Sequence, residues 1–225
     1  MTAPRQSGPY ERPGEPQSLG GSMLALAAVL DLLAEVFTGP ASDARGRASV
    51  LLSDPSFALP PLAALARPLR DLTDAGTGDI EIEYVRLFLH GQGATAHPYE
   101  SFYRTGQLMD AECLGGLDAL YAAAGVQPRK GSVLPDHLGV ELEFLALLLR
   151  GVLTSHAHGE ANLGVRRIAR KLLEDHLLPF SGTFRSRLGE LRPAPYFSAA
   201  ADALGHALAA ADAMLTVYHG ARDAR

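Results

Sequence analysis

Tryptophan is absent from this sequence, and cysteine occurs only once, at Cys113. A single cysteine cannot form an internal disulfide, which favours a reducing compartment. Because it is the only potential thiolate ligand, we expect neither an iron–sulfur cluster nor a structural zinc site. Aromatic residues make up only 7% of the chain, whereas alanine and leucine are abundant. This composition favours helices over a β-sandwich.

Positive charge is also scarce, since 20 lysines and arginines face 25 acidic residues and the formal net charge is -5. Phosphate binding needs a basic surface, so nucleic acid is excluded as the main partner, and a basic peptide fits better. Hydrophobic residues make up 47% of the 225 residues. That share suffices for a core, so it excludes global disorder and predicts one helical domain or two small lobes that share a core.

The chain offers no clear signal peptide or membrane span. Residues 1–21 are rich in proline, glycine, serine and charge, so we expect a disordered tail there, and a second one at residues 221–225. The apolar residues 23–37 lack a basic flank and contain Asp31 and Glu35. They are also fewer than the about 20 residues that span a membrane. We therefore expect a cytoplasmic protein without membrane insertion, whose folded domain covers residues 22–220.

Apolar residues recur at helical spacing along the chain, and no segment alternates long enough for a strand. The pattern predicts an all-α, single-domain bundle of about eight to ten helices. The helix that follows Pro135 is apolar nearly all round, which is typical of a buried central helix. Residues 126–134 are predicted to form a connector that acts as a hinge between the N-terminal and C-terminal halves of the chain. Helices are expected near residues 22–37, 43–52, 61–72, 79–88, 105–124, 135–152, 168–180 and 197–218.

Catalytic motifs are missing. The segment 91–93 (Gly-Gln-Gly) lacks the third glycine and the lysine of phosphate-binding loops, and no nucleophile elbow occurs. His137 and Glu141 are i, i+4 partners on one helix. With Glu143 they leave one alternative open, a small helical metal-dependent hydrolase. His156 and His158 can ligate a metal, but without further ligands in view we interpret them as part of a polar loop.

Four segments carry a family resemblance when they are taken in order and spacing. They are residues 83–88 (EYVRLF), 98–103 (PYESFY), 134–144 (LPDHLGVELEF) and 176–180 (HLLPF). Together they resemble the TorD/DmsD branch of the NarJ-like redox enzyme maturation chaperones, and the likeness extends over about residues 23–218. Two departures stand out: Leu134 replaces an acidic residue of the family, and the groove tryptophans are missing. The client is therefore open, and nitrate reductase and formate dehydrogenase are both candidates.

The resemblance implies an all-α fold, no catalysis and no bound cofactor. It implies a chaperone that binds the twin-arginine signal peptide, the apoprotein of a molybdopterin-containing oxidoreductase, or both, and that delays export until the cofactor is inserted. It leaves monomer and domain-swapped dimer open. Asp136, with Glu100, is expected to meet the arginines of the peptide. Carried over by motif, the peptide-binding residues are Leu87, Phe88, Pro98, Tyr99, Glu100, Ser101, Tyr103, Pro135, Asp136 and His137.

Overall fold

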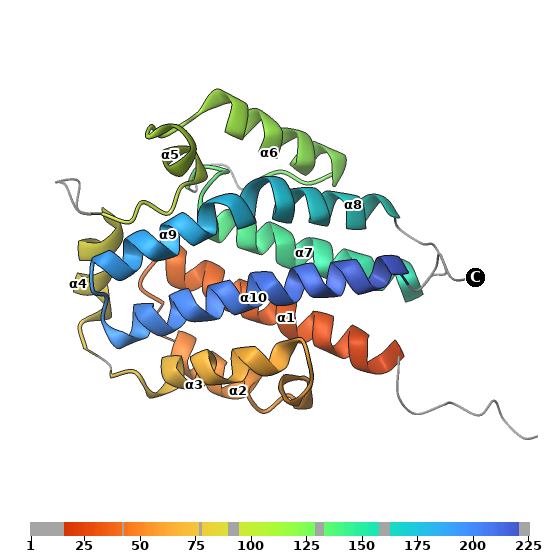
Figure 1. The fold of residues 1–225 in the computed structure, drawn as a ribbon, viewed down its shortest axis with the longest axis horizontal. Helices are drawn as coiled ribbons and strands as arrows, with labels where there is room; N and C mark the ends of the chain where they lie inside the picture. The colour runs from red at the N-terminus through yellow and green to blue at the C-terminus, as the bar shows by residue number, and fades with distance from the viewer. Residues whose placement is uncertain are drawn as a thin grey trace, which may run out of the picture.

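The structure is a computed structural model that describes residues 16–41, 43–76, 78–89, 95–128, 133–157 and 163–220. Every regular element within these ranges is a helix, so the predicted all-α class is confirmed. The β-type pairing found there is one isolated antiparallel bridge between Tyr99 and His137. The described residues thus form a helical bundle (Figure 1).

The elements follow one another closely along the chain. The first half contains α1 (Pro16–Thr38), α2 (Ala44–Leu51), the 3₁₀ turns η1 (Pro55–Ala58) and η2 (Leu62–Leu65), α3 (Ala66–Asp74), α4 (Ile80–Tyr84) and the π-helical turn η3 (Val85–Leu89). The second half contains α5 (Glu100–Thr105), α6 (Ala111–Ala123), α7 (Leu138–Ala157), α8 (Leu163–Lys171), the π-helical turn η4 (Leu172–Leu177), α9 (Leu178–Glu190) and α10 (Pro195–Gly220).

The core lies where α1 packs along α7 and against α10. In Figure 1 these helices occupy the middle of the molecule, with α2 and α3 on one side and α5 and α6 on the other. Leu33, Leu145 and Leu204 are fully buried, one from each central helix. Gly139 lets α1 and α7 approach closely, because a Cβ atom there would lie 2.8 Å from the carbonyl oxygen of Ala34. The prediction that α7 is a buried central helix is confirmed.

One helical stretch, Gly20–Thr38 within α1, is long and apolar enough to cross a membrane, with a mean hydropathy of 1.7. Two thirds of it (67%) is buried inside the fold. Burial of this kind is what a core helix of a bundle requires. The apolarity of α1 is therefore accounted for by its packing against α7 and α10.

Two of the boundaries that differ from the sequence prediction are the starts of α1 and α6. Helix α1 begins at Pro16, so residues 16–21 are helical and not part of a tail; proline is favoured at a first helical position because its missing N–H would be unpaired there. Ser22, where the predicted helix begins, is consequently a buried residue inside α1. The predicted helix 105–124 starts later, as α6 at Ala111, because Gly106 adopts φ 76° and ends α5 at Thr105. Residues 1–15, 129–132 and 221–225 lie outside the described ranges, so the tails and the hinge stay predictions.

Helices α8 and α9 form one continuous run through η4. A π-helical turn holds one residue more than an α-helical turn and often occurs at functional sites. The turn ends just before Pro179, which has no N–H to donate to the preceding turn. Both π-helical turns contain residues of the four family-like segments, namely Leu87 and Phe88 in η3 and His176 in η4.

Candidate functional site

Two of the family-like segments are hydrogen-bonded to each other. The amide of Leu138 donates to the carbonyl of Pro98 over 2.8 Å, and the amide of Glu100 donates to the carbonyl of Asp136 over 2.9 Å. Between them lies the bridge of Tyr99 and His137, whose rings meet edge to face at 4.9 Å. Segments 98–100 and 136–138 therefore form one rigid unit, the junction, although Ser101 and Asp136 lie 35 positions apart along the chain.

Asp136 acts as a cap within the junction. Its Oδ2 accepts hydrogen bonds from the amide of Ser101, at 3.1 Å, and from the Ser101 hydroxyl. The side chain is fully buried, and Oδ1 has no hydrogen-bond partner among the described residues. Capping the first turn of α5 satisfies an otherwise free amide. In this conformation a peptide arginine could reach the carboxylate only by displacing surrounding side chains, so the expected direct contact stays a prediction.

Glu100 is also fully buried and is held from two sides. Arg104 donates to its Oε1 over 2.8 Å, and Nδ1 of His176 lies 2.8 Å from its Oε2. Burial acts to raise the pKa of Glu100, but the hydrogen bonds from His176 and Arg104 outweigh it, so the pKa lies below its ordinary value. Glu100 is therefore ionised, and its two oxygens are already occupied.

Burial disfavours the ionised forms of two further groups near Glu100. Glu141 of α7 is completely buried, which raises its pKa well above the ordinary value, helped by the nearby Glu100 and Asp136 carboxylates. Burial also raises the pKa of the Cys113 thiol, and Glu100 adds to the effect. Neither oxygen of Glu141 has a hydrogen-bond partner within the described part of the chain. An unpartnered buried carboxyl group lowers stability, so it calls for an explanation.

His137 is an uncharged acceptor. Its Nδ1 accepts a hydrogen bond from the amide of Gly139 over 3.1 Å, near the first turn of α7. Burial lowers its pKa to about 4, so the ring is neutral at physiological pH. The predicted pairing of His137 with Glu141 is not formed through their side chains, because His137 bonds Gly139 instead. Glu143 is exposed on another face of α7. The three residues of the hydrolase alternative are thus not brought together.

The predicted residues Leu87, Phe88 and Tyr103 lie in or beside the core. Phe88 packs edge to face against Phe197, with ring centroids 5.5 Å apart, and Tyr103 stacks with Phe180 at 6.0 Å. Leu87 is fully buried, and its carbonyl accepts from the amide of Ala96. Among the ten predicted residues only Tyr99, Tyr103 and Pro135 keep partly exposed side chains; the others, Leu87, Phe88, Pro98, Glu100, Ser101, Asp136 and His137, are buried.

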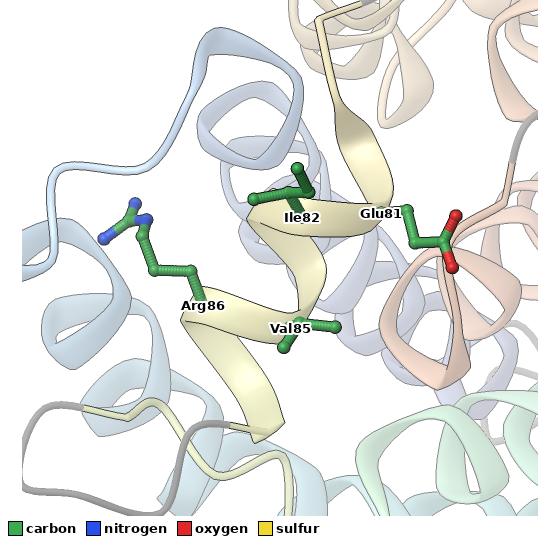
Figure 2. A pocket seen from close by; sticks show the side chains of 4 residues that line it. All are labelled: Glu81, Ile82, Val85 and Arg86. Carbon is green, nitrogen blue, oxygen red and sulfur yellow. The ribbon is translucent and has the colours of Figure 1, made fainter.

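The opposite face of α4 and η3 is apolar and exposed. Ile82 is 65% exposed, Val85 38% and Leu89 62%, and their spacing places them on one side of the helix. We call them the exposed apolar face. A depression of about 390 Å³ is lined by Glu81, Ile82, Val85 and Arg86, and a second of about 420 Å³ lies on the other side of Ile82, toward Tyr196. Figure 2 shows Glu81 and Arg86 reaching out in opposite directions from this turn.

The two charged residues of this depression differ in their partners. Arg86 bonds both oxygens of Glu83 at 2.7 Å and the carbonyl of Leu191 at 3.1 Å, which ties η3 to the turn before α10. The exposed side chain of Glu81 has no hydrogen bond or ion pair with any other described residue. The free charge beside the exposed apolar face is therefore negative.

Sequence reasoning missed both the exposed apolar face and the buried group of Glu100, Cys113, Glu141 and His176. The exposed apolar face could have been predicted from the sequence, because Ile82, Val85 and Leu89 form a second apolar stripe beside Tyr84, Leu87 and Phe88. The buried group could not have been predicted, because its members come from four elements and share no local spacing.

Two comparisons with known proteins found a match. The family model of the nitrate reductase delta subunit matches residues 57–186, more than half of the chain. A crystal structure of a candidate redox enzyme maturation protein from Archaeoglobus fulgidus is 20% identical, with a TM-score of 0.40, and the match covers 83% of this chain and 99% of that one. No curated protein sequence matches. The match over residues 57–186 includes α5, the junction and η4, and the chain belongs to the nitrate reductase delta subunit family, a family of redox enzyme maturation chaperones.

Proposed function

We propose that this protein is a cytoplasmic, non-enzymatic chaperone that binds the twin-arginine signal peptide and the apoprotein of a molybdopterin-containing oxidoreductase. It delays export until the cofactor has been inserted and folding is complete. The observation that carries the proposal is the exposed apolar face, Ile82, Val85 and Leu89, with the unpaired carboxylate of Glu81 beside it. Exposed apolar surface of this kind marks binding sites more often than chance exposure does.

The exposed apolar face matches the chemistry of a signal peptide. The hydrophobic stretch of such a peptide can lie along Ile82, Val85 and Leu89, as a helix in a groove or as an extended segment. Its arginines then fall near Glu81, and the formal net charge of -5 favours the approach of a basic segment. Burying one large aliphatic side chain contributes about 1.5–3 kcal/mol, so a few such contacts can supply most of a micromolar affinity.

The junction has a supporting role in this proposal. Asp136 and Ser101 fix α5 against the start of α7, and so they orient the partly exposed rings of Tyr99 and Tyr103. These rings offer a second apolar contact for the client. Release needs no nucleotide hydrolysis, because a folded, cofactor-loaded client no longer presents the peptide and the unfolded surface together, and the bound population falls.

The test is a calorimetric titration with a synthetic twin-arginine signal peptide of a molybdopterin-containing oxidoreductase. Ile82→Ser should weaken binding roughly ten- to hundredfold, because it removes an apolar contact of about 1.5–3 kcal/mol. Val50→Ser is the matched control, since Val50 is 73% exposed on α2, away from the proposed surface. Equal affinities of Ile82→Ser and the wild type would rule out the exposed apolar face as the binding surface.

A second titration separates the two carboxylates. Glu81→Gln and Asp136→Asn are each combined with a peptide whose two arginines are replaced by glutamine, which gives two double-mutant cycles. We expect a coupling energy for Glu81 of about 0.2–1 kcal/mol, the range of exposed ion pairs. For Asp136 we expect none, because it acts through the cap of α5. A clear coupling for Asp136 would instead restore it as the residue that meets the arginines.

A further inference from the structure

Three ligand-type side chains converge inside the molecule at the meeting of α5, α6 and η4. Glu100, Cys113 and His176 each offer one ligand atom, and these atoms all lie within 4.8 Å of one another. All three residues are buried, with exposed fractions of 0%, 1% and 6%. A carboxylate, a thiolate and an imidazole are the donor types that proteins use for zinc and neighbouring metals.

A second observation points to the same place. Glu141 of α7 is fully buried, and neither of its carboxylate oxygens has a hydrogen-bond partner among the described residues. Glu141 lies outside the group of three ligand atoms that are within 4.8 Å of one another, but it is near enough to Glu100 and Cys113 to interact with both electrostatically. Native proteins seldom leave such a group unsatisfied without a ligand or a functional reason.

We propose that Glu100, Cys113 and His176 bind one divalent transition-metal ion, with zinc as the expected occupant, and that the Glu141 carboxylate moves toward them to supply the fourth donor. Four donors suit the tetrahedral coordination of a structural zinc ion. Because they belong to four elements, α5, α6, α7 and η4, the ion cross-links the junction and the helices around it.

The orientation of His176 fits this role. Its Nδ1 faces Glu100 at 2.8 Å, whereas its other ring nitrogen, Nε2, faces α6. A Cβ atom on Gly116 would lie 3.4 Å from that Nε2, so the glycine makes room for the ring. Nδ1 is therefore the ligating nitrogen, and the ion replaces its hydrogen bond to Glu100 Oε2, because zinc bonds of about 2.0 Å to each atom hold the two donors farther apart than 2.8 Å.

The charges around the site also balance. One thiolate and two carboxylates carry three negative charges, and a divalent ion compensates for two of them. The guanidinium of Arg104, bonded to the other oxygen of Glu100 at 2.8 Å, compensates for the third. Buried charges are tolerated when they are paired or ligate a metal, and the metal-loaded site meets that condition.

Metal binding must displace protons. Burial raises the pKa of both Cys113 and Glu141 and so disfavours their ionised forms. A metal ligand has to be deprotonated, so binding should release protons and should tighten as the pH rises. Calorimetry in two buffers with different ionisation enthalpies measures how many protons are released.

The experiment uses the full chain with its purification tag removed, after treatment with a chelator. Titration with Zn²⁺ should give one site per chain. Co²⁺ should produce the intense visible bands of tetrahedral cobalt and the near-ultraviolet charge-transfer band of a cobalt–thiolate bond. Cys113→Ser should abolish the charge-transfer band. Cys113→Ser and Glu141→Gln should each weaken metal binding at least about tenfold, which even loss of an outer-shell partner can cause.

Matched controls are available on the same helices or of the same type. Glu143→Gln changes an exposed glutamate two residues beyond Glu141, and His206→Asn changes an exposed histidine of α10; neither should alter the spectrum or the affinity. Circular dichroism checks that each variant is folded. If Cys113→Ser does not fold, the wild-type cobalt spectrum and the proton release decide the matter alone. Absence of the thiolate band in the wild type, or undiminished binding by folded Cys113→Ser, for instance at His156 and His158, would overturn the proposal.

Discussion

Two buried regions of this molecule differ in the forces that hold them. The core between α1, α7 and α10 consists of leucine, alanine and phenylalanine side chains, and Leu145 is typical of it. The junction and its neighbours bury Glu100, Asp136, His137 and Glu141 to the same degree. Apolar burial is non-directional and tolerates small shifts, whereas buried polar groups depend on each hydrogen bond and on protonation. The core should therefore determine stability, and the junction should determine how stability responds to pH and to ligands.

The largest expected effect is in the core. Leu145→Ala should lower the free energy of unfolding by about 2–5 kcal/mol, because Leu145 is fully buried at the centre of α7. Urea denaturation measures the change. Leu147→Ala, two residues along the same helix but 47% exposed, should cost less than about 0.5 kcal/mol. Equal losses in the two variants would show that α7 is not the central helix.

The pH response should come from the junction. Burial lowers the pKa of His137 to about 4 from an ordinary 6.5, so the unfolded chain takes up the proton first as the pH falls. The stabilisation from neutral His137 is complete above pH 6.5 and is lost as the pH falls toward 4. The loss should amount to about 2–3 kcal/mol.

His137→Asn isolates this contribution. The asparagine oxygen can still accept from the Gly139 amide but does not titrate, so the variant should lose less stability than the wild type between pH 7 and pH 4. Urea denaturation at several pH values gives the two slopes. His206→Asn on the exposed side of α10 should keep the wild-type slope. Parallel slopes for wild type and His137→Asn would mean that His137 is already accessible to protons.

A smaller effect of opposite sign is expected at Glu141. In the chelator-treated protein, Glu141→Met should raise the free energy of unfolding by about 1–3 kcal/mol at neutral pH, because it removes an unpartnered buried carboxyl group of similar volume. The pKa of Glu141 is raised in the folded state, so its destabilisation begins above the ordinary value of 4.5 and grows with pH. The gain should thus shrink toward acidic pH. Glu143→Met, at an exposed position, should change little at any pH. A destabilised Glu141→Met variant would mean that the carboxyl group has a partner after all.

The smallest effect concerns a link between α6 and the junction. The Tyr121 hydroxyl donates to the carbonyl of Pro135 over 3.3 Å, and its ring packs on Phe144 at 4.3 Å. Tyr121→Phe keeps the ring and removes the hydrogen bond, so it should cost about 0.5–1.5 kcal/mol. Thermal denaturation can resolve this. A loss as large as that of Leu145→Ala would show that the polar region controls stability as strongly as the apolar core.

The sequence predicted the apolar region better than the polar one. Helical periodicity was sufficient to predict that α7 is a buried central helix, because its side chains are apolar nearly all round, and this can be seen without knowing which helices surround it. The family-like segments 98–103 and 134–144 indicated that the junction residues belong together, and they do meet. The directions of their side chains could not be predicted from the sequence, since the burial of Asp136 depends on the cap that it forms with Ser101. The Glu100–His176 contact joins residues 76 positions apart, and the spacing of these residues does not predict it.

The π-helical turn η4 has a consequence for how this chain can change over evolution. A π-helical turn contains one residue more than an α-helical turn, and one residue corresponds to about 100° of rotation in an α-helix. Deleting a single residue from Leu172–Leu177 would regularise the long helix. The deletion would also rotate α9 relative to α8. As a result, either His176 or the face of α9 that carries Phe180 would lose contact with the residues it packs against. The extra residue therefore fixes the register between two halves of one helix, and insertions or deletions should be tolerated in the loops but not here.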